Sequence, residues 1–361
     1  MKFVHIADMH FDCPFSTLFD KGNYGEIRRI EQRNAFKKMI DYIKENNIPF
    51  LFISGDLYEN EYVKETTIEY INECFKEIPN TKIFIAPGNH DPIIKNSYYK
   101  KFEWNKNVKI FDSKIEKVEL DNVNIYGFGF NDFYCSDCRL KEVVIEEKEK
   151  LNILVIHGTL NGASAEEKEY NSISEKELIE KGFDYVALGH IHKSNFIYGK
   201  NNKIIYPGAT ISHGFDELGK HGMIVGDINK DKLNLEFIPL DNREFKEIEL
   251  DCTEINTIEE LIEKINLLEL EDNCLYKLIL IGNRNFEINI YDIYKYEINK
   301  KIIKIKDNTK IKIDIEELSN ENTLIGLFAR QLKEKIRQTD DNEEIKILEK
   351  AIEIGIEALK D

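Results

Sequence analysis

The most constraining feature of this 361-residue chain is a short apolar segment that ends in a cluster of polar side chains. After Lys82, residues 83–86 are apolar and largely β-branched or aromatic, and a Pro-Gly pair follows them, which predicts a buried strand over residues 82–86 and then a turn. Asn89, His90 and Asp91 come next. Open α/β sheets bind their ligands at the carboxyl ends of such strands. An ordinary turn is the alternative, and the rest of the chain decides between the two.

The same pattern of an apolar run followed by polar side chains recurs four times. Residues 2–7, 48–54, 151–156 and 184–188 are predicted strands, and they end at Asp8 and His10, at Asp56, at His157, and at His190 and His192. Helices are predicted at residues 26–46 and 62–76, so the amino-terminal half has the strand–helix order of a parallel sheet. Asp8 and His10, two residues apart, are expected on one side of an extended segment.

Further predicted strands complete two sheets. Residues 108–111, 115–120 and 123–130 are predicted to form a meander, and residues 204–207, 223–228 and 233–240 follow as strands. We predict an α/β fold, a four-layer α-β-β-α sandwich over residues 1–241. Residues 242–361 are richer in Glu, Lys, Ile and Asn and predict a small α+β module that ends in helices at 322–337 and 342–359. The last helix has a wide apolar face, expected to dock on its own domain, with a partner as the alternative.

Composition limits the partners and the compartment. The net charge of −17 argues against a generic nucleic-acid binder, although a metal or a local potential can invert the sign in a cleft. Residues 142–150 are predicted as a charged helix with a solvated face. No apolar stretch approaches the roughly 18 residues of a membrane span. The chain runs straight into a strand with Asp8 among its first ten residues, unlike a signal peptide, so we predict a cytoplasmic protein.

Cysteines and three isolated histidines have structural interpretations. The six cysteines are expected to be free thiols, and Cys135 with Cys138 has the spacing of half a zinc site with no second pair. His5 is predicted to be a core histidine, with a role behind the site as the alternative. His213 and His221 flank a glycine-rich loop that is predicted to be a plain turn, with a position in the cleft as the alternative.

The polar strand ends carry the donors of a metal centre. Five of the eight histidines lie there together with two aspartates and one asparagine. Imidazole, carboxylate and carboxamide suit manganese, iron or zinc. The seven candidate ligands are Asp8, His10, Asp56, Asn89, His157, His190 and His192. Seven are too many for one tetrahedral ion, so we predict two divalent ions roughly 3.5–4 Å apart with a bridging carboxylate.

Five motifs resemble those of calcineurin-like metallophosphoesterases, in order and over about residues 1–240. They are Asp8-x-His10, Gly55-Asp56, Gly88-Asn89-His90-Asp91, His157-Gly158 and Gly189-His190-x-His192. The resemblance implies a first ion held by Asp8, His10, Asp56 and His192, and a second held by Asp56, Asn89, His157 and His190. It also implies attack on phosphorus by a hydroxide that bridges the ions, its pKa lowered toward about 7. His90, not a ligand, is expected to protonate the departing oxygen, with Asp91 orienting it.

Finer features resemble the SbcD-type DNA repair exonucleases. Residues 4–12, 185–193 and 206–209 carry this likeness, and residues 12–15 resemble the YhaO-like branch. This implies a manganese-dependent hydrolase, a nuclease that cuts phosphodiesters of DNA beside an SMC-like coiled-coil ATPase, with residues 242–361 as a capping domain and a homodimer as a further partner. Many relatives carry a histidine three residues after the bridging aspartate. Here Glu59 takes that place, so either it faces away or the substrate approaches differently.

Two other function classes stay open from the sequence. The first is a phosphodiesterase or phosphatase for a small molecule, which needs no additional module after residue 242. The second is a scaffold subunit of an SMC-like ATPase complex without catalysis, which predicts lost ligands, and none of the seven candidate ligands is missing.

Overall fold

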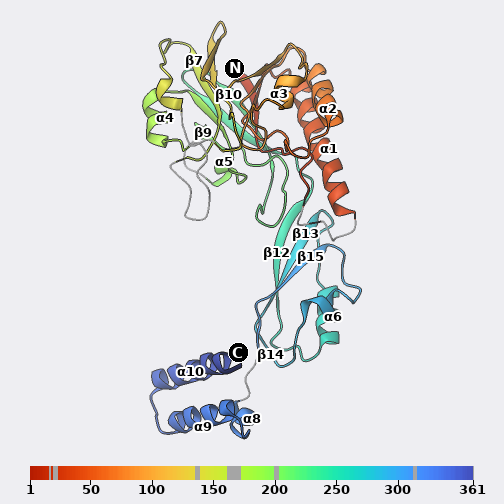
Figure 1. Cartoon of the computed structure of the whole chain (residues 1–361), viewed down its shortest axis with the longest axis vertical. Helices are drawn as coiled ribbons and strands as arrows, with labels where there is room; N and C mark the ends of the chain where they lie inside the picture. The colour runs from red at the N-terminus through yellow and green to blue at the C-terminus, as the bar shows by residue number, and fades with distance from the viewer. Residues whose placement is uncertain are drawn as a thin grey trace. The chain divides into compact units, whose positions relative to one another are not determined.

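A computed structural model describes residues 1–15, 18, 23–134, 139–160, 172–198, 203–311 and 315–360. The chain, coloured by residue number in Figure 1, divides into two compact units. Unit 1 comprises Met1–Lys246 and Asp272–Leu275, and unit 2 comprises Glu247–Glu271 and Tyr276–Asp361. The Cys135 and Cys138 pair lies outside the described residues. The four described cysteines are buried, and none forms a disulfide within the described part of the chain.

Unit 1 contains a six-stranded sheet in the order β11-β10-β1-β2-β3-β4. The four strands from β1 to β4 are parallel, and β10 and β11 add antiparallel neighbours at the β1 side. The bounds are β1 Lys2–Ile6, β2 Phe50–Ile53, β3 Lys82–Ile85, β4 Val108–Ile110, β10 Gly222–Ile228 and β11 Leu233–Pro239. Because β1, β2 and β3 are parallel, the segments after them leave the sheet at one edge.

A second sheet of unit 1 has the order β5-β6-β7-β8-β9. Its first pair is antiparallel and the rest are parallel. The bounds are β5 Glu116–Glu119, β6 Val123–Gly127, β7 Leu151–His157, β8 Tyr185–Gly189 and β9 Ile204–Ile205. The predicted meander is wrong for its first strand: β5 and β6 form the expected antiparallel pair, but β4 pairs with β3 in the first sheet, and the chain changes sheets before β5. Short strands and tight turns predict that strands adjacent in the sequence pair with each other. They do not show which sheet each strand joins.

The inner faces of the two sheets form one hydrophobic core. Phe3, Phe52 and Phe84 of the first sheet lie in the same buried cluster as Ile153 and Tyr185 of the second. The Phe3 and Tyr185 ring centroids are 4.6 Å apart. This shared core fixes the sheets against each other, so their strand ends keep a constant relation.

Helices lie on both sides of unit 1. α1 Tyr24–Glu45 and α2 Glu65–Lys76 lie on one side, and α4 Glu175–Lys181 lies on the other (Figure 1). The short helices are α3 Tyr98–Lys101, α5 Asn195–Tyr198 and the 3-10 turn η2 Arg139–Glu142. The predicted helix at residues 142–150 is wrong, since no helix follows η2 there. Val143 packs in the hydrophobic core instead. Glu147 forms salt bridges with Lys117 and Lys150, so its charge is paired without a helix.

Unit 2 is a small α+β assembly. Its sheet has the order β12-β13-β15, with β13 parallel to β15, and β14 pairs with β16. The elements are β12 Glu244–Asp251, α6 Ile258–Asn266, β13 Cys274–Ile281, β14 Asn283–Arg284, α7 Ile290–Ile293, β15 Ile302–Asp307, β16 Lys310–Ile311, α8 Ile315–Ser319, α9 Leu324–Arg337 and α10 Asn342–Lys360. α10 buries Ile352 and Ile356, whereas Ile347 and Ile354 are exposed. No helix of the described chain combines the length and apolar character needed to cross a bilayer.

Candidate metal centre

The polar segments after β1 and β2 are held together by backbone hydrogen bonds. Asp8 N–H donates to Gly55 O at 3.1 Å, and His10 N–H donates to Asp56 O at 2.8 Å. The φ angles of Asp8, His10 and Asp56 are 50°, 48° and 52°. The expectation of an extended segment at Asp8 and His10 is therefore wrong. Their side chains meet because the backbone coils in the left-handed region at the strand end.

Two glycines allow the strand ends to approach closely. Gly55 has a φ of 88°, and a Cβ there would overlap the ring of His157. A Cβ on Gly189 would overlap the carbonyl oxygen of Ser54, which lies at the end of β2. The first sheet and the second sheet therefore touch at this edge through backbone, and any larger residue would separate them.

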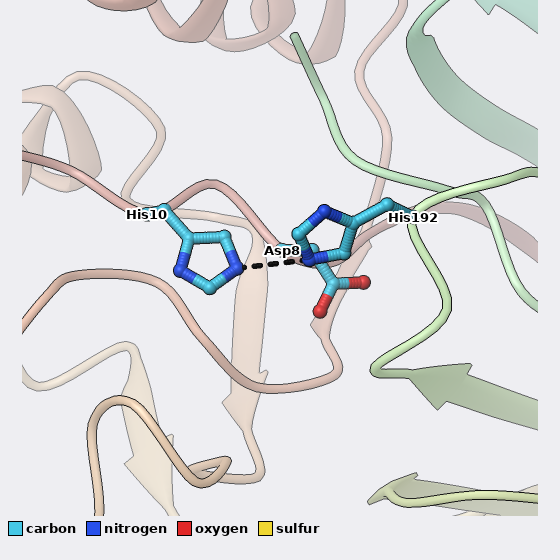
Figure 2. Close-up of side chains that lie close together, drawn as sticks. All are labelled: Asp8, His10 and His192. Carbon is cyan, nitrogen blue, oxygen red and sulfur yellow. Dashed lines mark hydrogen bonds between the residues drawn. The ribbon is translucent and has the colours of Figure 1, made fainter. Parts of the chain in front are cut away.

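Asp8, His10 and His192 form the first group of candidate ligands. Each offers one ligand atom, and these atoms all lie within 4.8 Å of one another. The Nε2 atoms of His10 and His192 are 3.1 Å apart, and the Asp8 carboxylate lies beside them (Figure 2). The backbone N–H of His190 donates to Asp8 Oδ1 at 2.9 Å and fixes the carboxylate.

Asp8, Asp56 and His157 form a second group with the same 4.8 Å limit. His157 Nε2 lies 3.3 Å from Asp56 Oδ2 and 3.0 Å from Asn89 Oδ1. Asp56 Oδ2 is also 3.7 Å from His10 Nε2, so this one carboxylate adjoins both groups. The His190 ring centroid lies 5.2 Å from that of His157. The structure thus gathers all seven predicted residues at one sheet edge.

The histidines are oriented by acceptors on their outer nitrogens. His10 Nδ1–H donates to Glu59 Oε1 at 2.7 Å, His192 Nδ1–H donates to Glu217, and His157 Nδ1–H donates to Ser54 O at 2.8 Å. In the neutral imidazole that donates from Nδ1, Nε2 presents a lone pair to the centre. Metal-binding histidines characteristically donate the other ring N–H to a carboxylate or a backbone carbonyl. The donor set and its orientation therefore fit divalent cations.

Comparison with known proteins agrees with this geometry. The family model of calcineurin-like phosphoesterases matches residues 1–194, more than half of the chain. The chain belongs to this family. Phosphoesterases of this family hydrolyse phosphoesters at a binuclear divalent metal site, for which the gathered His and Asp side chains are the candidate ligands.

Two known proteins are similar to this chain. The uncharacterized metallophosphoesterase YhaO of Bacillus subtilis strain 168 is 26% identical over 280 residues, which cover 73% of this chain and 66% of that protein. The chain thus spans just under two thirds of that relative. The crystal structure of TT1561 of Thermus thermophilus is 13% identical, and the alignment covers 65% of this chain and 98% of that one with a TM-score of 0.39.

The electrostatics of the candidate metal centre reflect buried charges in close contact. Burial raises the pKa of Asp8 to about 6. Burial also acts to raise the pKa of Asp56, but the adjacent His157 outweighs it and holds that pKa well below its usual range. Burial lowers the pKa of His10 to about 4 and that of His190 to about 3. His10 and His190 are therefore neutral, as a metal ligand must be.

Burial acts to lower the pKa of His157 and of His192, but the charge of Asp56 raises the pKa of His157 to about 9, and the hydrogen bond to Glu217 raises that of His192 to about 9. Both of these imidazoles would lose a proton on binding a metal.

His90 lies at the rim of the site and differs from the other histidines. Its side chain is 46% exposed, and its Nδ1–H donates to Glu59 Oε2 at 2.9 Å. Burial acts to lower its pKa, but the hydrogen bond to Glu59 and the charge of Asp56 raise it to about 9. The predicted orienting role of Asp91 is wrong. Asp91 is fully buried and accepts from the backbone N–H groups of Gly88, Asp56 and Leu57, so it shapes the loop and not the imidazole.

Three residues of the site were not predicted from the sequence as part of it. They are Glu59, Glu217 and His213. Glu59 faces the site, which excludes the alternative that it points away. Glu217 contacts His192 and also accepts from His213 Nδ1–H at 3.1 Å. His213, predicted in a plain turn, lies with its ring centroid 5.2 Å from that of His10. A carboxylate in the same glycine-rich loop as His213 was the available signal.

The two remaining histidines are structural. His5 is fully buried as predicted, and its two ring nitrogens lie 2.9 Å from Tyr185 Oη and from Ser54 Oγ. His221 is buried and contacts the carbonyl oxygens of Ala209 and Glu217. His221 therefore closes the loop that carries Glu217.

Proposed function

We propose that this phosphoesterase is a DNA exonuclease of the SbcD type that hydrolyses phosphodiester bonds in DNA repair with two divalent ions, manganese being favoured over iron or zinc. The observation that carries the proposal is the position of Asp56, whose Oδ2 lies 3.7 Å from His10 Nε2 and 3.3 Å from His157 Nε2. A carboxylate shared by two ligand groups suits a pair of neighbouring ions. The preference for DNA rests on the sequence motifs of residues 4–12, 185–193 and 206–209.

The proposal gives each residue a role. Asp8, His10, Asp56 and His192 hold the first ion, and Asp56, Asn89, His157 and His190 hold the second. Two bound ions supply Lewis acidity toward the phosphoryl oxygens and a nucleophile at neutral pH. His90 stands at the exposed rim and donates the proton of Nε2 to the oxygen that departs from phosphorus.

The finer architecture and the partners belong to the same proposal. The two sheets with their flanking helices make a four-layer sandwich over residues 1–241, and residues 242–361 make a capping domain. Exposed apolar side chains on α9 and α10 support a partner surface, for which we propose an SMC-like coiled-coil ATPase, with a second copy of this chain as the alternative. They are Leu324, Leu327, Ile347 and Ile354. A cytoplasmic location stays a prediction.

A small-molecule phosphodiesterase is the second candidate, and one observation favours it. The Glu59 carboxylate lies 2.9 Å from Nδ1 of His90, the residue proposed to contact the departing oxygen, and the chain carries a net charge of −17. A carboxylate beside the scissile phosphate repels a polyanion more than it repels a single phosphodiester. The test must therefore compare the two substrate classes directly.

The experiment uses end-labelled linear DNA, single- and double-stranded, with closed circular single-stranded DNA as the control for end dependence. Each is incubated with the protein and manganese, iron, zinc or magnesium, beside bis-p-nitrophenyl phosphate. We expect manganese-dependent release of nucleotides from linear DNA only. Hydrolysis of bis-p-nitrophenyl phosphate without cleavage of any DNA would favour the small-molecule enzyme. Absence of all hydrolysis with two bound ions would favour the scaffold.

A further inference from the structure

The three-stranded sheet of unit 2 is parallel throughout. Glu244 N–H donates to Asn273 O at 3.0 Å and Cys252 N–H donates to Ile281 O at 2.9 Å, so β12 runs parallel to β13. β15 is parallel to β13 on its other side. Right-handed crossovers between strands in this order all lie on one face, so the connections through α6 and α7 share that face. All-parallel sheets occur almost only with both faces covered, which leaves the second face of this sheet to be explained.

Burial along the strands identifies the uncovered face. Leu278 and Leu280 of β13 and Ile305 of β15 are buried, and α6 buries Leu261 and Ile265. The residues that alternate with the buried strand residues lie on the opposite face of the sheet and are exposed or half-buried. We define this open face by Glu247 and Glu249 of β12, Lys277 and Ile279 of β13, and Lys304 and Lys306 of β15.

The charges of the open face are separated by sign. Lys277, in the middle strand, lies 2.7 Å from Glu247 of β12. Ile279 lies beside Lys306 in the register of β13 and β15, and the hydrogen bonds between β12 and β13 place Glu249 on its other side. Within the described chain, Glu249 and Lys306 form no ion pair. An acidic edge and a basic edge with unpaired charges therefore flank an isoleucine at the centre.

We propose that the open face binds the open face of a second copy of this chain, related to the first by a two-fold axis parallel to the strands. Rotation about this axis exchanges the two edges and keeps each residue at its height along the strands. Glu249 then faces Lys306 of the second copy, and the symmetry repeats this pair. Ile279 packs against Ile279 of the second copy on the axis, in the aligned arrangement of stacked sheets.

Charge complementarity selects this occupant and this axis. A two-fold axis across the strands would place Glu249 against a second β12 and Lys306 against a second β15, where like charges repel. The chain as a whole carries a net charge of −17, so a basic edge is the kind of surface that can attract another acidic copy. Each copy also covers the parallel sheet of the other. The inference does not depend on the proposed function.

Sedimentation velocity of the full chain measures the association. We expect a reversible dimer with a Kd on the order of 10 µM, because the interface is small. Lys306→Glu and Glu249→Lys should each raise the Kd about tenfold or more, since each change converts two attractions into two repulsions. Glu263→Lys and Lys264→Glu are the matched controls, the same charge changes at exposed positions of α6, and they should dimerise like the wild type.

Mixing the two variants tests the pairing itself. In an equal mixture of Lys306→Glu and Glu249→Lys, opposite charges face each other again at both pairs, so we expect a heterodimer from two chains that are monomeric alone. A mixture that stays monomeric overturns the proposal. A wild-type chain that is monomeric at about 100 µM overturns it as well, and so does a dimer that persists in both variants, because that dimer uses another surface.

Cross-linking at Ile279 gives a readout that does not depend on charge. A bismaleimide with a spacer of about 10 Å, the distance between packed sheets, should join two Ile279→Cys chains across the axis. Lys264→Cys on α6 is the control and should form no more covalent dimer than the wild type, whose own cysteines set the background. Cross-linking of Ile279→Cys that does not exceed this background overturns the proposed face.

Discussion

Four of the seven candidate ligands have a backbone that L-residues rarely adopt. Asp8, His10, Asp56 and His190 have φ angles of 50°, 48°, 52° and 108°. Such conformations cost on the order of 1–3 kcal/mol each and persist only when the surroundings enforce them. Here Asp8, His10 and Asp56 are held by the backbone hydrogen bonds between the segments after β1 and β2, and the N–H of His190 donates to the Asp8 carboxylate. The strain is thus located where the side chains must converge on a common point.

The role of His90 can be tested by truncation. His90 offers a ring nitrogen within 4.8 Å of ligand atoms of His10 and Asp56, but it is not one of the seven proposed ligands, so His90→Ala should retain two ions. Turnover of DNA should fall about 10²–10⁴-fold, the contribution of a positioned acid. Ion content and nuclease rate are measured on the same preparation. Cleavage at the wild-type rate would remove the leaving-group role.

Asp56 should be essential for ion binding. Its carboxylate adjoins both ligand groups, so Asp56→Ala removes a ligand from each ion and leaves His10 and His157 without their shared neighbour. We expect both ions to be lost on dialysis and hydrolysis to fall to background. Circular dichroism checks that the variant is folded. Two ions retained in a folded Asp56→Ala protein would contradict the bridging assignment.

Glu217 should tune the affinity for the first ion. It accepts from His192 Nδ1–H, and His192 belongs to the group with Asp8 and His10. Replacing such a partner behind a ligand typically costs about 10–100-fold in metal affinity. Glu217→Gln should therefore weaken one of two ion-binding steps in a calorimetric titration. Asp216→Asn, the same change at the exposed neighbouring residue, is the control and should bind like the wild type.

At the scale of single residues, the sequence predicts the candidate metal ligands better than the side chains that contact those ligands. The seven candidate ligands follow from their places after apolar runs, and the structure brings them together. Glu59 and Glu217 are harder to predict because a carboxylate that orients a histidine needs no fixed spacing from it. They lie 49 and 25 residues from their partners His10 and His192. Only the folded chain shows those contacts.

At the scale of elements, strands are predictable and their pairing is not. Apolar runs located β1, β2, β3, β7 and β8 to within a few residues, because burial on both faces leaves a continuous signal. The meander failed because β4 and β5 are consecutive in sequence but belong to different sheets. Local turn chemistry favours pairing of neighbours, while the shared core of the two sheets decides where each strand packs.

The closest approach of the two sheets gives a prediction for Gly189 at the end of β8. A Cβ there would overlap the Ser54 carbonyl oxygen, which accepts from His157 Nδ1–H. Gly189→Ala should therefore displace His157, lower ion affinity and destabilise unit 1 by about 1–3 kcal/mol, as overpacking does. Gly25→Ala is the control, because a Cβ at Gly25 meets nothing within 4 Å. Denaturation and ion titration measure both effects, and an unaltered Gly189→Ala would contradict the contact.

For the whole molecule, the segments that form the ion site span most of unit 1. They run from residue 8 to residue 217, and they place the carboxylates of Asp8, Asp56, Glu59 and Glu217 near one another. Mutual repulsion of these charges opposes folding unless cations or protonated histidines compensate it. Composition reveals only the net charge of −17, whereas the fold concentrates part of it at one edge.

Ion binding should consequently stabilise the folded protein. A ligand that binds only the folded state adds RT ln(1 + [L]/Kd), or about 2.7 kcal/mol at one hundred times Kd. We expect the melting temperature to fall on treatment with a chelator and to rise again on titration with manganese until both sites are filled. Asp56→Ala should show no such rise, which separates site binding from weak binding elsewhere on an acidic surface. A wild-type melting temperature that is independent of manganese would mean that the gathered strand ends are stable without cations, and the metal centre itself would then be in question.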